Sequence, residues 1–131
     1  MEKIGFIGTG VMGSSMIKHL LNAGYPVRVY NRTKSRADAV VSEGAVWCDT
    51  PAAVTAQSDI VITMVGYPKD VEETYFGESG IFSKADDHHI LIDMTTSTPT
   101  LARKIAAFGK ERGVRTLDAP VSGGDKGAQN G

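Results

Sequence analysis

A glycine-rich motif lies directly between a short apolar run and an amphipathic segment near the start of this 131-residue sequence. Residues 3–8 have the composition of a buried strand, and Gly8-Thr9-Gly10-Val11-Met12-Gly13 matches the pattern G-x-G-x-x-G. Apolar residues at helical spacing follow as far as Gly24, a typical helix terminator. The pattern alone is weak, but a strand before it and a helix after it provide the context of a dinucleotide-binding turn.

Each glycine of the motif has a physical role in such a turn. Gly8 allows the tight bend, Gly10 lets the backbone approach a pyrophosphate, and Gly13 lets the helix pack closely on the strand. The helix N-terminus then presents free N–H groups and a partial positive charge to the anion. The alternative is a tight turn that binds nothing. We expect the turn to bind a dinucleotide through Gly8, Thr9, Gly10, Val11 and Met12.

The rest of the sequence continues the alternation of strands and helices. Further strands are expected at residues 27–30, 45–47, 59–65, 89–94 and 114–118. Helices are expected from Thr33 to about residue 43, and over residues 51–57, 68–76 and 99–112. This order predicts an α/β fold, a doubly wound parallel sheet of six strands (a Rossmann fold) with helices on both faces. Residues 1–118 would form this dinucleotide-binding domain, and residues 119–131 a glycine-rich segment leading to a second domain.

Composition excludes several other classes of function. The net charge of -1 argues against binding to nucleic acid through bulk electrostatics. No apolar run is long enough to cross a membrane. The single cysteine, Cys48, cannot form an internal disulfide, and we interpret it as a packing residue. With no export segment at the start, these features predict a cytoplasmic location.

The end of the second predicted strand indicates which dinucleotide would bind. A site for NAD usually has a carboxylate there, which holds the ribose 2′-hydroxyl. This chain has Asn31-Arg32-Thr33, 21 residues after Gly10. Neutral Asn31 does not repel a 2′-phosphate, and Arg32 can pair with it bidentately. The pattern predicts preference for NADP(H), with weaker NAD(H) binding possible, unless Arg32 is simply a solvated arginine at a helix start.

Three stretches together resemble the β-hydroxyacid dehydrogenases, which include 3-hydroxyisobutyrate dehydrogenase, tartronate semialdehyde reductase and the glyoxylate/succinic semialdehyde reductases. The three stretches are residues 5–13, residues 93–99 (Asp-Met-Thr-Thr-Ser-Thr-Pro) and residues 118–124 (Asp-Ala-Pro-Val-Ser-Gly-Gly). The family shares its cofactor domain with 6-phosphogluconate dehydrogenase. The resemblance implies a hydride transfer between NADP(H) and a small 3-hydroxy acid or its semialdehyde.

The resemblance also implies further site residues. Met64, Val65 and Val71 would lie against the cofactor, although the loop here is two residues longer than the family's usual Met-Leu-Pro. Thr96 would approach the nicotinamide ribose, or it could instead satisfy the N-terminus of the following helix. Ser122, Gly123 and Gly124 would hold the substrate carboxylate, the alternative being a linker between domains.

In the family, the general-acid lysine and an all-helical second domain follow this segment, and that domain makes most subunit contacts. We therefore expect this chain to bind cofactor but to turn over little, and the full-length protein to be a homo-oligomer. The alternatives are a stand-alone, non-enzymatic dinucleotide-binding module and the cofactor domain of a 6-phosphogluconate dehydrogenase-type enzyme. No metal is expected, because His88 and His89 are adjacent and predicted to lie in a solvated loop.

Overall fold

A computed structural model describes residues 2–65, 67–95 and 98–119. Six strands lie within these ranges: β1 (Ile4–Ile7), β2 (Val27–Tyr30), β3 (Val46–Trp47), β4 (Ile60–Thr63), β5 (Ile90–Asp93) and β6 (Arg115–Asp118). The helices are α1 (Val11–Asn22), α2 (Asp38–Ser42), α3 (Pro51–Ala56), α4 (Pro68–Phe76) and α5 (Pro99–Glu111). Two 3₁₀ turns, η1 (Lys34–Ala37) and η2 (Ile81–Ser83), complete the described elements. No helix in the described ranges is both long and apolar enough to span a lipid bilayer.

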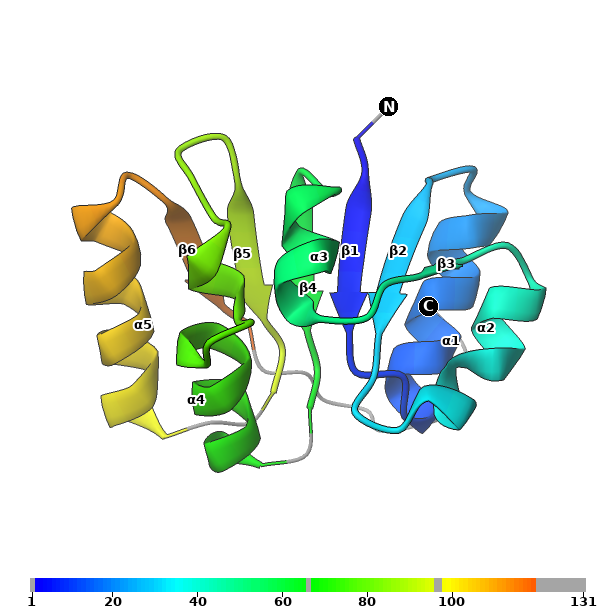
Figure 1. Ribbon diagram of the computed structural model, residues 1–131, viewed down its shortest axis with the longest axis horizontal. Helices are drawn as coiled ribbons and strands as arrows, with labels where there is room; N and C mark the ends of the chain where they lie inside the picture. The colour runs from blue at the N-terminus through cyan, green and yellow to red at the C-terminus, as the bar shows by residue number, and fades with distance from the viewer. Residues whose placement is uncertain (1, 66, 96–97, 120–131) are drawn as a thin grey trace.

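The strands form one parallel sheet in the order β3-β2-β1-β4-β5-β6 (Figure 1). The chain winds outward from β1 to β3 and then returns to add β4 on the other side of β1. The fold is therefore the doubly wound sheet that the sequence predicts. The order reverses between β1 and β4, and such a switch point leaves a crevice at the carboxyl ends of the strands.

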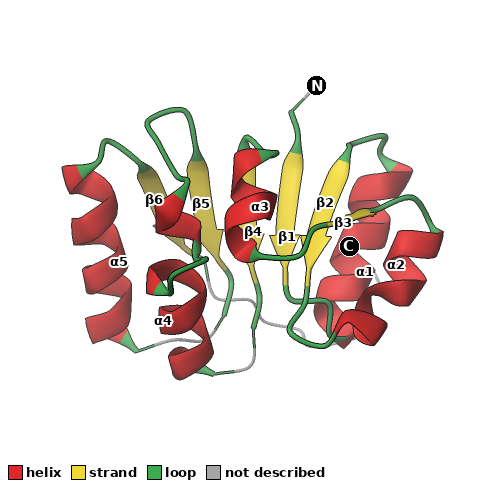
Figure 2. Cartoon of the chain, in the orientation of Figure 1, coloured by secondary structure: helices red, strands yellow, loops and turns green. Residues whose placement is uncertain are grey.

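Helices cover both faces of the sheet, and each face has its own apolar core. Ile17 of α1 and Val40 of α2 pack against Phe6 and Val29 on one face. Figure 2 shows α3 and α4 in front of the other face, where Val54 and Tyr75 join a second cluster with residues of α5. All the side chains named here are at most 1% exposed. Such burial explains why β-branched and aromatic residues dominate the strands.

Two segments differ from the sequence prediction. Thr33 makes no side-chain capping bond, and the helix expected from it is divided into η1 and the short α2. Residues 77–84, for which the sequence predicts neither a helix nor a strand, contain η2, whose Ile81 and Phe82 are buried in the core. In contrast, the helix expected over residues 51–57 is confirmed as α3, and the Thr50 hydroxyl caps it by accepting a hydrogen bond from the Ala53 N–H at 3.0 Å.

Gly8 joins the ends of three strands. Its N–H donates to the Tyr30 carbonyl of β2 at 2.9 Å, and its φ of +106° lies in the region that favours glycine. A Cβ atom at this position would lie 1.9 Å from the carbonyl oxygen of Met64, which directly follows β4. A side chain here is therefore excluded both by backbone conformation and by contact with backbone that cannot move aside.

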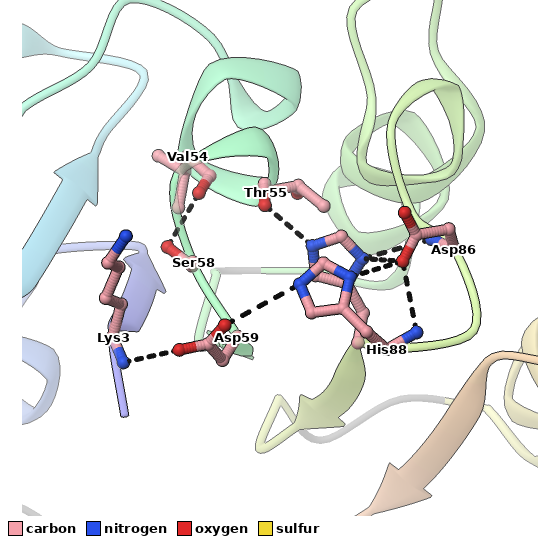
Figure 3. A network of polar contacts seen from close by, with 8 residues as sticks. Lys3, Val54, Thr55, Ser58, Asp59, Asp86 and His88 are labelled. Atoms are coloured by element: carbon pink, nitrogen blue, oxygen red, sulfur yellow. Dashed lines mark hydrogen bonds and ion pairs between the residues drawn. The ribbon is translucent and has the colours of Figure 1, made fainter. Parts of the chain in front are cut away.

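A polar network links the opposite, amino ends of the strands (Figure 3). The Lys3 N–H donates to Asp59 at 2.8 Å, and the Asp59 carboxylate lies 3.6 Å from His88. His89 is only 2% exposed: its Nε2–H donates to the Thr55 carbonyl at 2.8 Å, and its Nδ1 accepts from the Asp86 N–H at 3.0 Å. Because a carbonyl can only accept a hydrogen bond, the Nε2 atom of His89 is the donor in the contact with Thr55. The prediction of a solvated loop is therefore wrong for His89, whereas His88 is half exposed.

The crowding at Gly8 predicts a sharp contrast between two substitutions in the same motif. Gly8→Ala should lower the free energy of unfolding by at least about 2 kcal/mol, because it adds backbone strain and a clash. Gly10→Ala should cost less than about 1 kcal/mol, because a Cβ there meets nothing within 4 Å. Urea denaturation measures both values, and equal losses would contradict this account.

Candidate functional site

A cavity of about 770 Å³ opens at the carboxyl ends of the strands, at the switch point of the sheet. This volume is within the range of small-molecule and cofactor sites. The glycine turn, the end of β2, the residues after β4, the start of α3 and one side of α4 line the cavity. The loop of residues 77–80 completes the wall, and the Ala52 N–H of α3 anchors it by donating to the Ser79 carbonyl at 2.9 Å.

The glycine turn has the features that an anionic ligand requires. Gly10 is the N-cap of α1 and offers no side-chain acceptor to the first turn, which also contains no acidic residue. The first N–H groups of the helix therefore keep their capacity to bind an anion. The Thr9 hydroxyl is buried and, within the described part of the chain, has no hydrogen-bond partner. An orphaned donor beside an open backbone at Gly10 fits a phosphate-bearing cofactor.

Asn31 supports the glycine turn from β2. Its side-chain carbonyl accepts from the Thr9 N–H at 3.0 Å, and its amide donates to the Thr33 carbonyl at 2.8 Å. Asn31 lines the cavity, but both ends of its carboxamide are occupied by protein backbone. Its observed role is therefore to hold two loops in register.

Arg32 lies at the rim of the cavity and is 73% exposed. Its Nη2 is 3.3 Å from Asp70 Oδ1 and 3.5 Å from Glu73 Oε2, both on α4. Arg32 is thus largely solvated, as the alternative from sequence has it, and is also paired with two carboxylates. Exposed pairs of this kind are weak, so a stronger anion could displace them.

A buried network joins the ends of β4 and β5 beneath the cavity. Asp93 accepts hydrogen bonds from the Thr63 hydroxyl at 3.0 Å and the Thr95 N–H at 2.9 Å. The Thr95 hydroxyl in turn accepts from the Val65 N–H at 2.9 Å. Burial raises the pKa of Asp93 above its ordinary value, although the hydrogen bonds oppose this shift. The network fixes the backbone of Val65, which lines the cavity.

The structure brings together most of the residues predicted to bind the cofactor. Those lining the cavity are Gly8, Gly10, Met12, Asn31, Arg32, Thr33, Met64 and Val65. Thr9 is buried and does not line the cavity itself, and Val11 begins α1. Val71 does not line it: this side chain is fully buried in the core under α4, so its position does not support the predicted contact. Thr96, Ser122, Gly123 and Gly124 lie outside the described residues.

Sequence reasoning missed several cavity residues. Asp70, Glu73 and Thr74 come from one side of α4, and Thr50 and Pro51 from the start of α3. A signal for them was present in the sequence. Pro68 and the pair Thr50-Pro51 indicate helix starts, and helices that follow parallel strands begin at the carboxyl edge of the sheet, where the ligand site lies. The N-cap of α5 is Thr98, whose hydroxyl accepts a hydrogen bond from the Leu101 N–H at 3.2 Å. Capping of this helix, the alternative role considered for Thr96, is thus performed by Thr98.

The geometric argument against a metal at His88 and His89 is also wrong. One ligand atom from each histidine and one from Asp86 lie within 4.8 Å of one another. Both ring nitrogens of His89 nevertheless have hydrogen-bond partners, which account for its position. Cys48 is buried, and burial raises the pKa of its thiol, which confirms the interpretation of a packing residue.

The fold and the cavity together define a dinucleotide-binding α/β domain. Residues 3–131 match the family model described as the NAD binding domain of 6-phosphogluconate dehydrogenase, and the chain belongs to that family. It is an NAD(P)-binding domain, as the glycine motif predicts.

Curated relatives agree with the resemblance to β-hydroxyacid dehydrogenases. An uncharacterized oxidoreductase, YkwC, from Bacillus subtilis is 59% identical over 99% of this chain and 45% of its own length. A probable 3-hydroxyisobutyrate dehydrogenase-like protein of Arabidopsis thaliana, described as mitochondrial, is 51% identical over 98% of this chain and 39% of its own length. The chain thus spans less than half the length of these relatives.

A solved structure shows the same fold with cofactor bound. It is described as Psf3 in complex with NADP+ and 2-OPP, and it superposes with a TM-score of 0.92 at 30% sequence identity. The match covers 97% of this chain and 45% of that one.

The position of Asn31 predicts separate effects of two substitutions. Asn31→Ala leaves the buried Thr9 N–H without its acceptor and should lower the free energy of unfolding by about 1–3 kcal/mol. Asn31→Asp keeps that acceptor but adds a negative charge, so it should lower NADPH affinity more than NADH affinity. Thermal unfolding and fluorescence titration measure these effects. Unchanged stability of Asn31→Ala would show that the carboxamide does not support the turn.

Proposed function

We propose that this chain is the cofactor half of an NADP(H)-preferring oxidoreductase that acts on a small 3-hydroxy acid or its semialdehyde. The observation that carries the proposal is that one cavity is lined both by the glycine turn and by Arg32. Such a cavity presents helix N–H groups at one end and a guanidinium at the other. These two kinds of donor suit the pyrophosphate and the ribose 2′-phosphate of one ligand.

Different residues would hold different parts of the cofactor. Gly10, the start of α1 and the Thr9 hydroxyl would bind the pyrophosphate. Arg32, with Lys34 and Arg36 nearby, would bind the 2′-phosphate. When bound, the nicotinamide donates or accepts the hydride.

The two remaining predicted contacts are also part of the proposal. Thr96 would approach the nicotinamide ribose, and Ser122, Gly123 and Gly124 would hold the substrate carboxylate. Residues 119–131 would lead to a helical domain that supplies the proton donor and the subunit contacts of a homo-oligomer. The cytoplasm is the proposed location, although the Arabidopsis relative is described as mitochondrial.

Cofactor preference tests the role of Arg32. Fluorescence titration should give tighter binding of NADPH than of NADH by roughly 10- to 100-fold, the value of one or two charge-assisted hydrogen bonds. Arg32→Gln should remove most of this difference by weakening NADPH alone. Arg103→Gln on α5 removes the same charge away from the cavity and should leave both affinities unchanged. Equal affinities of the wild-type protein for the two cofactors would contradict the preference.

Turnover separates the enzyme from a simple binding module. Reduction of a carbonyl develops alkoxide charge and needs a proton donor. Among the described residues, no lysine or histidine lines the cavity. We therefore expect the 131-residue chain to bind NADPH without sustained reduction of glyoxylate or succinic semialdehyde, and a protein carrying the helical half to reduce one of them. Absorbance at the nicotinamide band measures the rate, and steady turnover by the chain alone would contradict this expectation.

A further inference from the structure

The acidic side of α4 faces the arginine that would select the cofactor. Asp70 and Glu73 are one helical turn apart, and both carboxylates contact the same nitrogen of Arg32, at 3.3 and 3.5 Å. All three residues line the cavity. Binding of a 2′-phosphate to Arg32 therefore requires that the ion pairs of Arg32 with these two carboxylates be broken first. Neither carboxylate was identified from the sequence as part of the site.

Asp70 is held rigidly for this contact. Its Oδ2 accepts from the Tyr67 N–H at 3.1 Å, which caps the start of α4, while its Oδ1 faces Arg32. The Asp70 side chain is 23% exposed, whereas Glu73 is 67% exposed. A carboxylate fixed by a helix cap loses little conformational entropy when it binds a cation, so it competes well with a ligand.

We propose that Asp70 and Glu73 are specificity-determining residues that compete with the cofactor's 2′-phosphate for Arg32 and so limit the preference for NADP(H). The inference rests on the proposed role of Arg32. A cofactor without the 2′-phosphate does not need Arg32, and its affinity should be indifferent to the acidic pair. Because both ion pairs are partly solvated, they reduce the preference without abolishing it.

Isosteric substitutions test the competition. Asp70→Asn retains an oxygen for the Tyr67 N–H, and Glu73→Gln retains the length of the side chain. The double variant should bind NADP+ about 3- to 10-fold more tightly, the combined effect of two exposed ion pairs, and should bind NAD+ unchanged. Isothermal titration calorimetry measures both affinities in the purified protein. The unchanged NAD+ affinity also verifies that the variant is folded.

Two controls separate this mechanism from a general effect of charge. Glu72→Gln removes a carboxylate from the same helix, but Glu72 contacts Lys104 at 3.8 Å and does not line the cavity, so NADP+ affinity should change less than about 2-fold. In an Arg32→Gln background, the Asp70→Asn/Glu73→Gln pair should likewise have less than about a 2-fold effect on NADP+ binding. A full effect in that background would overturn the competition in favour of direct repulsion.

The outcomes also distinguish this inference from the proposed function. If the wild-type protein binds neither NADP+ nor NAD+, both fail together. If Arg32→Gln removes the NADP+ preference while the Asp70→Asn/Glu73→Gln variant binds NADP+ as the wild type does, the role of Arg32 stands. In that case only the role of the acidic pair is overturned.

Discussion

The close approach of Gly8 to the backbone after β4 is the constraint on which the site depends. The Cβ that Gly8 lacks would lie 1.9 Å from the Met64 carbonyl, and the Gly8 N–H is bonded to the end of β2. Three strand ends therefore meet at one residue. Because they meet so closely, the turn into α1 is directed to the crevice at the switch point, and the loops of β2 and β4 form the walls beside it.

The periodic part of the fold was predictable from sequence because its signals are local. Buried parallel strands such as β4 are short apolar runs, and the two adjacent residues Thr50 and Pro51 indicate a helix start. The failures have a common cause. His89 is buried where the Thr55 carbonyl, 34 residues earlier in the chain, accepts a hydrogen bond from its ring, and no local sequence pattern indicates that partner. Ile81 and Phe82 likewise form η2 because they fill the core under α4.

The residues of the candidate site were largely predictable from sequence, but their hydrogen-bond and ion-pair partners were less so. The glycine motif and Asn31-Arg32-Thr33 identified the correct edge of the sheet. Asn31, however, is bonded to Thr9 across 22 residues, and Arg32 is paired with Asp70 and Glu73 on a helix that starts 36 residues later. Such partners depend on how β2 and α4 pack around the switch point. A charge pattern at one strand end therefore indicates which ligand is favoured, whereas the opposing charges that moderate it emerge only in three dimensions.

The double hydrogen bond of Asn31 has a mechanical consequence. One carboxamide ties Thr9 in the glycine turn to Thr33, which directly follows Arg32. The two loops that would contact opposite parts of a dinucleotide are thereby linked to each other by hydrogen bonds. Because one side chain bonds to both loops, a displacement of either loop would act directly on the other.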